Sequence, residues 1–380
     1  MSKGLFSASA APDTDEDRLA WLRLLRSRRV GAVTFHRLMA DHGSAQAALA
    51  ALPAVARAAG VAAYAPCPVE VARHEMVQAR LAGARMLCFG APDYPDALLD
   101  LPDAPPLLWA QGDVGLLARP MVAMVGARNA SSLGLRMARR LAEGLAEAGF
   151  VVVSGLARGI DAEAHKAALA HGTVAVQAGG VDVIYPIENG ALAADIAAQG
   201  CRISEQPMGL APQARHFPQR NRIVSGLAQA VIVVEAASRS GSLITARTAL
   251  DQGREVLAVP GHPFDARAAG CNMLIRDGAV LVRSAADVME ALGIAAMGQT
   301  AEPQREAAPL PGPKPDTRPL GEVAALHSRI LARLGPSPLA EDQLIRDLAV
   351  LPAQVAPELL TLELEGKIVR QAGGLLSRAV

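Results

Sequence analysis

Residues 216–261 read HFPQRNRIVSGLAQAVIVVEAASRSGSLITARTALDQGREVLAVPG, and this stretch decides the fold. Two short apolar runs, 230–236 and 255–261, have the composition of strands buried on both faces of a parallel sheet. Between them, a turn rich in glycine and serine opens a helix that runs to about residue 250. The stretch therefore predicts a strand–helix–strand unit of an α/β domain.

The same stretch carries a local positive charge. Arg215, Arg220 and Arg222 lie close together, and no Asp or Glu occurs from residue 206 to residue 234. A helix start exposes unpaired backbone N–H groups and the positive end of the helix dipole, so the serine-rich turn at 240–242 is suited to binding an anion. Two interpretations stay open: a phosphate-binding face, or the ordinary loop chemistry of Gly and Ser.

The composition predicts a globular chain of two or three domains without a strong overall charge. Lys plus Arg and Asp plus Glu both total 37 in 380 residues, so any basic surface must be local. The 4 cysteines are scattered without a C-x-x-C pair, which favours buried, reduced thiols in a cytoplasmic protein over a disulfide frame or a zinc site. We expect no signal peptide and no membrane span, because no basic segment precedes an apolar core and no apolar run approaches ~18 residues.

Breaks in composition and periodicity predict five segments. Residues 1–15 form a flexible tail, 16–83 a helical domain of the SAM or helix–hairpin–helix kind, 84–295 a Rossmann-like domain, 296–320 a proline-rich linker, and 321–380 a winged-helix domain. The Rossmann-like domain is expected to begin with one short strand, followed by a proline-rich connector that carries Tyr94 and Trp109.

The third helix predicted for the winged-helix domain, within 352–366, has neither Arg nor Lys. A helix that reads duplex DNA needs such side chains to contact phosphates and bases. We therefore favour a protein-contact or accessory role for this domain.

Residues 121–292 repeat strand, turn and helix, which predicts a parallel, doubly wound sheet with helices on both faces. Ligands of such sheets bind at the carboxyl ends of the strands. The first turn there, GARNASSLG, has Arg128 and Ser131 where a dinucleotide fingerprint needs glycine, which argues against NAD or FAD. We expect Arg128 at the ligand face beside the following helix start, with a surface ion pair as the alternative.

The sequence contains no recognisable catalytic constellation and no P-loop. Asp161 is interpreted as the N-cap of a helix, and His165 as its packing or hydrogen-bond partner one turn later. His216 and His262 are interpreted as structural or binding residues, because neither has a partnered nucleophile.

Four motifs, in this order, resemble the DNA-processing protein A family (DprA, also called Smf): VGARNASSLG, SGLARGIDAEAH, FPQRNRIVSGL and VVEAASRSGSLITARTAL. The resemblance covers 18–292 strongly and the C-terminal domain more loosely. It implies a non-catalytic, cofactor-free protein of natural transformation that binds and protects single-stranded DNA and loads RecA recombinase. It also implies a homodimer, with single-strand-binding protein as a further partner.

The resemblance places the DNA-binding site on the turns and the arginine stretch. The implied residues are Gly126, Arg128, Asn129, Ser131, Ser154, Gly155, Arg215, Phe217, Arg220, Asn221, Arg222, Ser240, Gly241 and Ser242. We expect Arg128 and Arg220 to lie on turns at one sheet edge, to grip one run of phosphates and to be dispensable for folding. Since aromatic residues make up only 3% of the chain, phosphate contacts should outweigh stacking and the affinity should fall with salt.

Two other function classes stay open. Rossmann-like phosphoribohydrolases, which process nucleotides, share this topology but carry P-G-G-x-G-T-x-x-E, whereas here Gly179 and Gly180 are followed by Val181 and Asp182. A regulator that binds duplex DNA through the winged helix is the third possibility.

Overall fold

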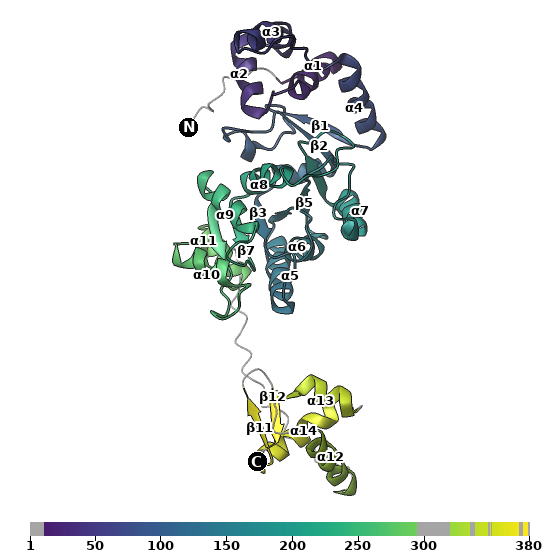
Figure 1. The fold of residues 1–380 in the computed structure, drawn as a ribbon, viewed down its shortest axis with the longest axis vertical. Coiled ribbons are helices and arrows are strands. Elements are labelled where there is room, and N and C mark those ends of the chain that lie inside the picture. Colours follow the sequence, from purple (N-terminus) through teal and green to yellow (C-terminus); the bar gives the residue numbers. More distant parts are fainter. Residues whose placement is uncertain are drawn as a thin grey trace. The chain divides into compact units, whose positions relative to one another are not determined.

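The computed structural model describes residues 11–294, 320–334, 339–348, 350, 352–371 and 375–378. They belong to two compact units, one within 1–298 and one within 299–380. The predicted helical and Rossmann-like domains share the first unit (Figure 1). Most of the predicted tail and nearly all of the predicted linker lie outside the described residues.

A sheet with the strand order β1-β2-β6-β5-β4-β3-β7-β8-β9 forms the centre of the first unit. The strands are β1 Arg85–Cys88, β2 Leu107–Gly112, β3 Met121–Val125, β4 Val151–Ser154, β5 Thr173–Val176, β6 Cys201–Ser204, β7 Ala230–Val233, β8 Glu255–Ala258 and β9 Val280–Leu281. Strands β3 to β9 pair in parallel, and β3 pairs with both β4 and β7. The chain therefore reverses its direction of winding between β3 and β7, which makes this pair the switch point of the sheet.

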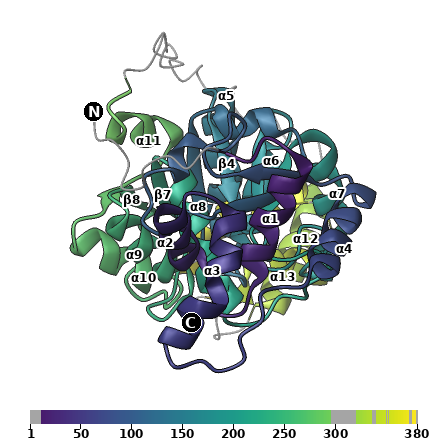
Figure 2. The ribbon, with the colours of Figure 1, turned by 90° about the horizontal axis from the view of Figure 1, so that it is seen from above.

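Helices cover both faces of the sheet, as the doubly wound prediction requires. One face carries α5 Ser132–Glu147, α6 Ile160–Ala168, α7 Gly190–Gln199 and α11 Ala285–Ala291; the other carries α8 His216–Leu227, α9 Ser242–Asp251 and α10 Ala269–Arg276 (Figures 1 and 2). Alternate residues of each strand, such as Val122 and Ala123 of β3, pack into opposite layers. The prediction of a Rossmann-like parallel sheet is confirmed.

Two parts of the sequence prediction for this unit were wrong. The connector before the first parallel strand contains β2, which pairs antiparallel with both β1 and β6. The apolar run around the buried Trp109 forms this strand despite the prolines before it. The arginine stretch, which we placed on a turn, begins helix α8, whose Ile223, Val224 and Leu227 pack on the sheet.

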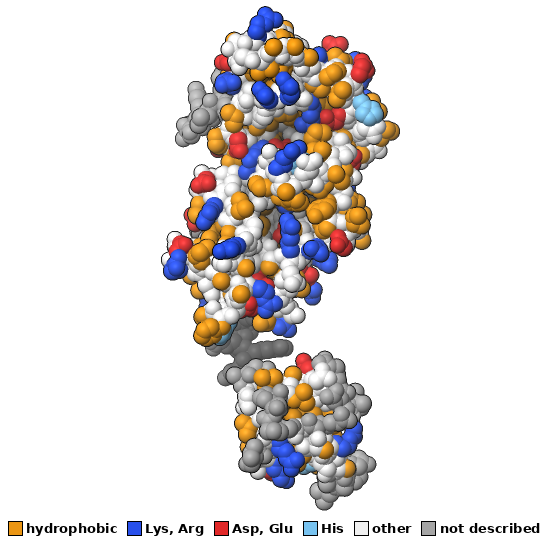
Figure 3. All heavy atoms as spheres, in the orientation of Figure 1, with side chains coloured by type: hydrophobic (Ala, Val, Ile, Leu, Met, Phe, Trp, Pro, Cys, Tyr) orange, Lys and Arg blue, Asp and Glu red, His pale blue; other side chains and the backbone are white. Residues whose placement is uncertain are grey.

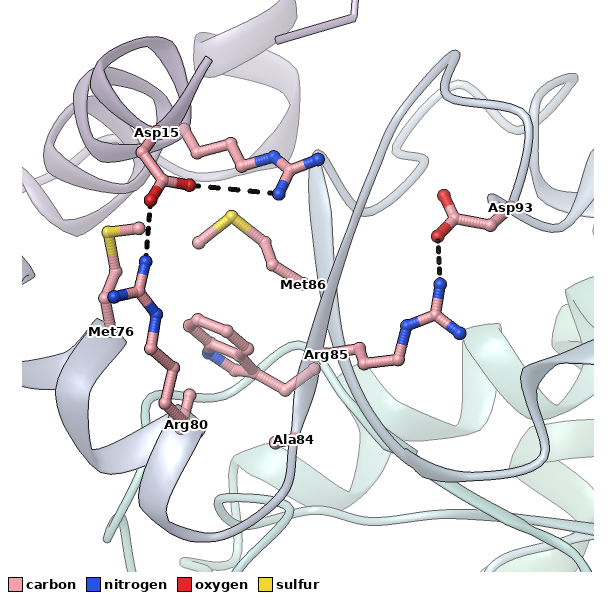
Figure 4. Close-up of a pocket in the computed structure, with 10 residues that line it drawn as sticks. Asp15, Met76, Arg80, Ala84, Arg85, Met86 and Asp93 are labelled. Carbon is pink, nitrogen blue, oxygen red and sulfur yellow. Dashed lines mark hydrogen bonds and ion pairs between the residues drawn. The ribbon is translucent and has the colours of Figure 1, made fainter. Parts of the chain in front are cut away.

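The N-terminal helices α1 Asp15–Arg26, α2 Ala32–His42, α3 Ala45–Ala58 and α4 Val69–Leu81 pack against the β1–β2 edge. Thr14 caps α1 through a reciprocal capping box with Asp17. Figure 4 shows a small hollow of about 200 Å³ at this junction, where Arg80 donates to Asp15 and Met86 faces the same space. The Arg80–Asp15 pair joins α4 to α1 within the helical domain, and Met86 of β1 lines the hollow from the side of the sheet.

The second unit has the winged-helix arrangement that the sequence predicts. Helices α12 Leu320–Arg333, α13 Glu341–Leu348 and α14 Pro352–Leu364 accompany a sheet of β10 Leu339–Ala340, β12 Leu375–Arg378 and β11 Ile368–Gln371. Its core contains Ile330, Leu344 and Leu359. The role of this domain stays a prediction.

All four cysteines are free and buried, as predicted. Burial raises the pKa of the Cys88 and Cys201 thiols to about 12, so both are protonated near neutral pH. In the described ranges, no helix combines the length and the apolarity that crossing a bilayer requires, and no cluster of three or more His, Cys, Asp or Glu side chains could hold a metal ion.

The junction between helical domain and sheet depends on the Glu75 carboxylate, which is 8% exposed. It accepts hydrogen bonds from the Nε and Nη2 of Arg26 and from the Trp109 indole N–H. We expect Glu75→Ala to lower the free energy of unfolding by about 3–5 kcal/mol in denaturant titrations, because the Arg26 side chain, 13% exposed, loses its carboxylate partner.

Glu70→Ala on the same helix is the matched control. Glu70 pairs with Arg73 at the surface, so its loss should change the free energy of unfolding by less than about 1 kcal/mol. Equal effects of the two substitutions would contradict the structural role of Glu75.

Candidate functional site

The loops after β3 and β7 flank the switch point, and a cavity of about 840 Å³ opens between them. The loop after β3 contributes Gly126, Arg128 and Asn129 to the lining of this cavity. The loop after β7 contributes Arg239, Ser240 and Gly241. Helix α8 contributes Phe217, Arg220 and Asn221. The cavity therefore lies where parallel α/β sheets bind their ligands.

A second cavity of about 530 Å³ adjoins the first on the side of β4 and β5. The two cavities share Arg128, Ala157, Phe217 and Arg220. Tyr185, from the loop after β5, lines only the second cavity. Together the cavities make one groove along the strand ends, which we call the switch-point groove.

Arg220 is the central side chain of this groove. It is only 7% exposed, and its Nε is buried without a hydrogen-bond partner in the structure. Its guanidinium packs directly on the backbone of Gly155, where any Cβ atom would collide with it. Burial lowers the pKa of Arg220, and the neighbouring Asp161 opposes that change. The groove thus holds a desolvated cation with unused donor capacity, which favours a bound anion.

Asp161 provides the negative charge nearest to this cation. Its carboxylate accepts the backbone N–H groups of Gly155 at 3.1 Å and Ala157 at 3.4 Å. Burial raises the pKa of Asp161, and the Arg220 guanidinium lowers it again. Asp161 is not the N-cap that we expected, because Gly159, with φ of 76°, caps α6 and places Asp161 inside its first turn.

His165 does not pair with Asp161 as the one-turn spacing suggested. Its Nδ1 lies 2.7 Å from the Thr173 hydroxyl, which itself donates to the Val152 carbonyl. Burial lowers the pKa of His165 to about 3, so the ring is neutral near pH 7. His165 is therefore a core residue between α6 and the sheet.

Arg128 stands exposed at the rim of the groove, directly after β3. Its guanidinium carbon lies 5.3 Å from the centre of the Phe217 ring, and that ring lies 5.9 Å from the ring of Tyr185. Arg128 forms no ion pair with any described residue, so the alternative of a surface ion pair finds no support in this part of the chain. A cation stacked on an aromatic pair can contact both a phosphate and a base.

The helix start at Ser131, a residue that the resemblance placed in the DNA-binding site, already holds a carboxylate. Glu235 fills it: the Ser131 hydroxyl donates to this carboxylate at 2.6 Å and the Ser131 backbone N–H at 3.0 Å. Ser131 also caps α5 through the N–H of Gly134, which lies against the same carboxylate. A negative charge is favourable at a helix N-terminus, so the Glu235 carboxylate serves as the anion at the start of α5 from within the protein.

The start of α9 has a hydroxyl partner instead, because the Ser242 backbone N–H donates to the Ser240 Oγ at 3.4 Å. Gly241 caps this helix without a side-chain hydrogen bond, and the hydroxyls of Ser240 and Ser242 lie 2.7 Å apart at the wall of the larger cavity. Of the two helix starts at the switch point, only that of α9 faces the groove with its own hydroxyl groups.

The groove brings together most of the residues that the sequence implied. These are Gly126, Arg128, Asn129, Gly155, Phe217, Arg220, Asn221, Ser240, Gly241 and Ser242. Four implied residues do not line it: Ser131, Ser154, Arg215 and Arg222.

All four of these side chains have partners within the protein, and that of Ser131 is Glu235. The Ser154 hydroxyl donates to the Met124 carbonyl inside the sheet. Arg222 pairs with Glu205 and Asp103 and lines a different hollow, beside α2. Arg215 is exposed at the start of α8, where its Nε donates to the His216 ring.

The expectation that folding tolerates the loss of both Arg128 and Arg220 needs correction for Arg220, since it is buried in the first unit and offsets the charge of Asp161.

Sequence reasoning missed three arginines that line the groove: Arg158, Arg239 and Arg267. Each lies in or beside a turn at a strand end, and that position was the available signal. Arg267 pairs with Asp265, and Arg158 lies 3.9 Å from Glu188, so Arg239 adds the least compensated charge. Figure 3 shows Lys and Arg side chains spread over the region where Figure 1 labels α8 and α9.

Three models of known protein families match the chain. DNA recombination-mediator protein A matches residues 85–293, the DprA-like N-terminal HHH domain matches 15–78, and the DprA winged helix domain matches 313–374. Protein Smf of Escherichia coli is 39% identical over 284 residues, 74% of either chain. DNA processing protein DprA of Bacillus subtilis is 45% identical over 213 residues, 55% of this chain and 72% of that protein.

Two solved structures share the fold. DNA processing protein A from Streptococcus pneumoniae has a TM-score of 0.55 and 39% identity, and the match covers 63% of this chain and 86% of that one. A structure on the single-stranded DNA binding mode of DNA processing protein A from Helicobacter pylori has a TM-score of 0.51 and 30% identity, covering 56% and 97%.

The buried position of Arg220 generates a prediction about stability. Arg220→Ala should lower the free energy of unfolding by about 1–3 kcal/mol at pH 7, because Asp161 stays buried without its cation. The folded-state pKa of Asp161 is already raised and rises further in this variant. The loss should therefore shrink as the pH falls and Asp161 becomes protonated.

Two further variants make the measurement specific. Asp161→Asn added to Arg220→Ala should recover part of the stability, whereas Arg128→Ala alone should change it by no more than about 0.5 kcal/mol. Equal destabilisation by Arg128→Ala and Arg220→Ala would contradict the stabilising interaction between Arg220 and Asp161.

Proposed function

This chain belongs to the family of DNA recombination-mediator protein A, and from that premise we propose that it binds single-stranded DNA in the switch-point groove. In this proposal it protects the incoming strand during natural transformation and loads RecA recombinase onto it without catalysing a reaction. The single observation that carries the proposal is the buried Arg220 side chain, which lines both cavities and has no hydrogen-bond partner at its Nε.

The chemistry of the groove suits a flexible nucleic acid strand. Arg128 and Arg220 line both cavities and offer guanidinium donors to successive phosphates. Phe217 and Tyr185 offer apolar ring faces for bases, which single strands expose and duplexes do not. The Helicobacter pylori relative, described by its single-stranded DNA binding mode, supports the same ligand.

An enzyme that processes nucleotides is the less favoured alternative. In the loop after β5, the Asp182 carboxylate accepts the Gly209 N–H, and a side chain at Gly180 would collide with Asp182. In sequence, Gly179 and Gly180 of this loop are followed by Val181 and Asp182. The loop thus lacks the P-G-G-x-G-T-x-x-E residues that the related phosphoribohydrolases use. Incubation with nucleoside monophosphates should release no free base.

RecA, single-strand-binding protein and a second copy of the chain are the proposed protein partners. Exposed apolar side chains on α9, Ile244 and Leu250, and the edge strand β9, with Val280 and Leu281, offer surface for a homodimer. A dimer would place two switch-point grooves on one strand and raise the apparent affinity.

The proposed function predicts that Arg128→Ala weakens binding of a labelled oligodeoxythymidylate by about ten- to a hundredfold in fluorescence anisotropy. The reason is the loss of one charge-assisted phosphate contact of about 1.5–3 kcal/mol. Arg128→Lys should retain only part of the affinity, because an ammonium cannot bind two phosphate oxygens at once as the planar guanidinium does. Duplex of the same length should bind more weakly, and ATP should not be required.

Arg140→Ala is the matched control, because Arg140 is exposed on α5 and does not line the groove. It should leave binding unchanged. If Arg128→Ala binds single strands as the unmodified protein does, or if duplex binds equally well, the proposed function fails.

The dimer generates a separate prediction. Sedimentation velocity at micromolar concentration should show a dimer, and Leu250→Asp should shift it toward monomer because a charge then enters an apolar interface. Leu133→Asp, at an exposed leucine on α5, should leave the dimer intact. A monomer for the unmodified chain under these conditions would rule out the proposed dimer.

A further inference from the structure

Phe264 is 95% exposed, more than any other large hydrophobic side chain in the described ranges. It lies in the loop that connects β8 to α10. The groove described above does not include it, because only Arg267 of this loop lines the larger cavity. A single exposed apolar side chain is common on protein surfaces, so its meaning depends on how the loop holds it and where it stands.

The loop presents Phe264 in a defined position. At its base, Asn272 of α10 exchanges two hydrogen bonds with the backbone of Gly261. At its tip, the Phe264 N–H donates to the His262 ring at 3.3 Å, and the two rings lie 5.7 Å apart. Asp265 closes the far side by accepting from the backbone and side chain of Arg267. This network orders the loop and leaves the aromatic ring in solvent, which lowers the entropic cost of stacking.

The Phe264 loop lies at one end of the switch-point groove. The strand order β5-β4-β3-β7-β8 places the loop that carries Tyr185 at one end of the groove and the Phe264 loop at the other. With neighbouring strands ~4.8 Å apart, these ends are separated by ~19 Å along the sheet edge. Arg220, Arg128 and Arg239 lie between the two aromatic ends. Cations flanked by aromatic rings are the pattern by which proteins bind single strands.

We propose that Phe264 stacks on a base of the same DNA strand whose phosphates contact Arg128 and Arg220, so that the strand crosses the sheet edge from Tyr185 to Phe264. This inference rests on the proposed function and assigns the partner of the exposed ring as a nucleobase. The continuity with the groove through Arg267 and the uncompensated charge of Arg239 favour DNA over a second copy of the chain.

The test compares an oligodeoxythymidylate with an abasic strand of the same length, which has the phosphates and lacks the bases. Phe264→Ala should weaken binding of the oligodeoxythymidylate by about five- to a hundredfold and leave binding of the abasic strand unchanged, because only base stacking is lost. Phe264→Trp should retain the affinity. Leu133→Ala, at an exposed leucine of α5, serves as the control and should change neither affinity.

Phe264→Trp also gives a direct signal, because Trp21 and Trp109 are both buried. Its fluorescence should change on addition of the oligodeoxythymidylate and not of the abasic strand. Three results would overturn the inference: unchanged affinity of Phe264→Ala for the oligodeoxythymidylate, an equal loss of affinity for both strands, or a shift of Phe264→Ala from dimer toward monomer in sedimentation. Failure of the unmodified protein to bind either strand would instead refute the proposed function itself.

Discussion

A buried guanidinium at the switch point of the sheet is the constraint on which the site depends. Arg220 packs so closely on Gly155 that a Cβ atom there would displace its guanidinium, and the Asp161 carboxylate lies close enough to offset part of its charge. Burial of a charge is costly unless partners replace its hydration. Nε lacks such a partner and the guanidinium lines both cavities, so we propose that an anion from outside the protein completes the site. A phosphate of a nucleic acid strand meets this requirement.

The two helix starts at the switch point decide where that anion can bind. In dinucleotide-binding sheets, the pyrophosphate lies at the start of the helix that follows the first strand. Here the Glu235 carboxylate occupies that position on α5 and accepts hydrogen bonds from the Ser131 backbone N–H and hydroxyl. The guanidinium groups of Arg128, Arg220 and Arg239 line the larger cavity along the strand ends instead. A ligand with repeated phosphates matches this arrangement better than a compact nucleotide does.

The sequence predicted the doubly wound sheet, because β-branched runs such as 230–236 alternate with helical patterns. It could not separate Arg220 from Arg222, which lie two positions apart in one charged stretch. Pro218 and weak periodicity hid helix α8, and on a helix such neighbours face different sides: Arg220 the groove, Arg222 the pair with Glu205 and Asp103. Likewise, nothing local shows that Glu235 reaches the start of α5, since the contact spans more than a hundred residues.

The central claim is that arginines of the switch-point groove neutralise phosphates of a single strand. The dependence of the binding constant on salt concentration measures this most directly, because each neutralised phosphate releases counterions. If Arg128, Arg220 and Arg239 each contact one phosphate, a plot of log K against log salt concentration for an oligodeoxythymidylate should have a slope of about −2. A slope near zero would contradict the account, because the strand would then be held without phosphate contacts.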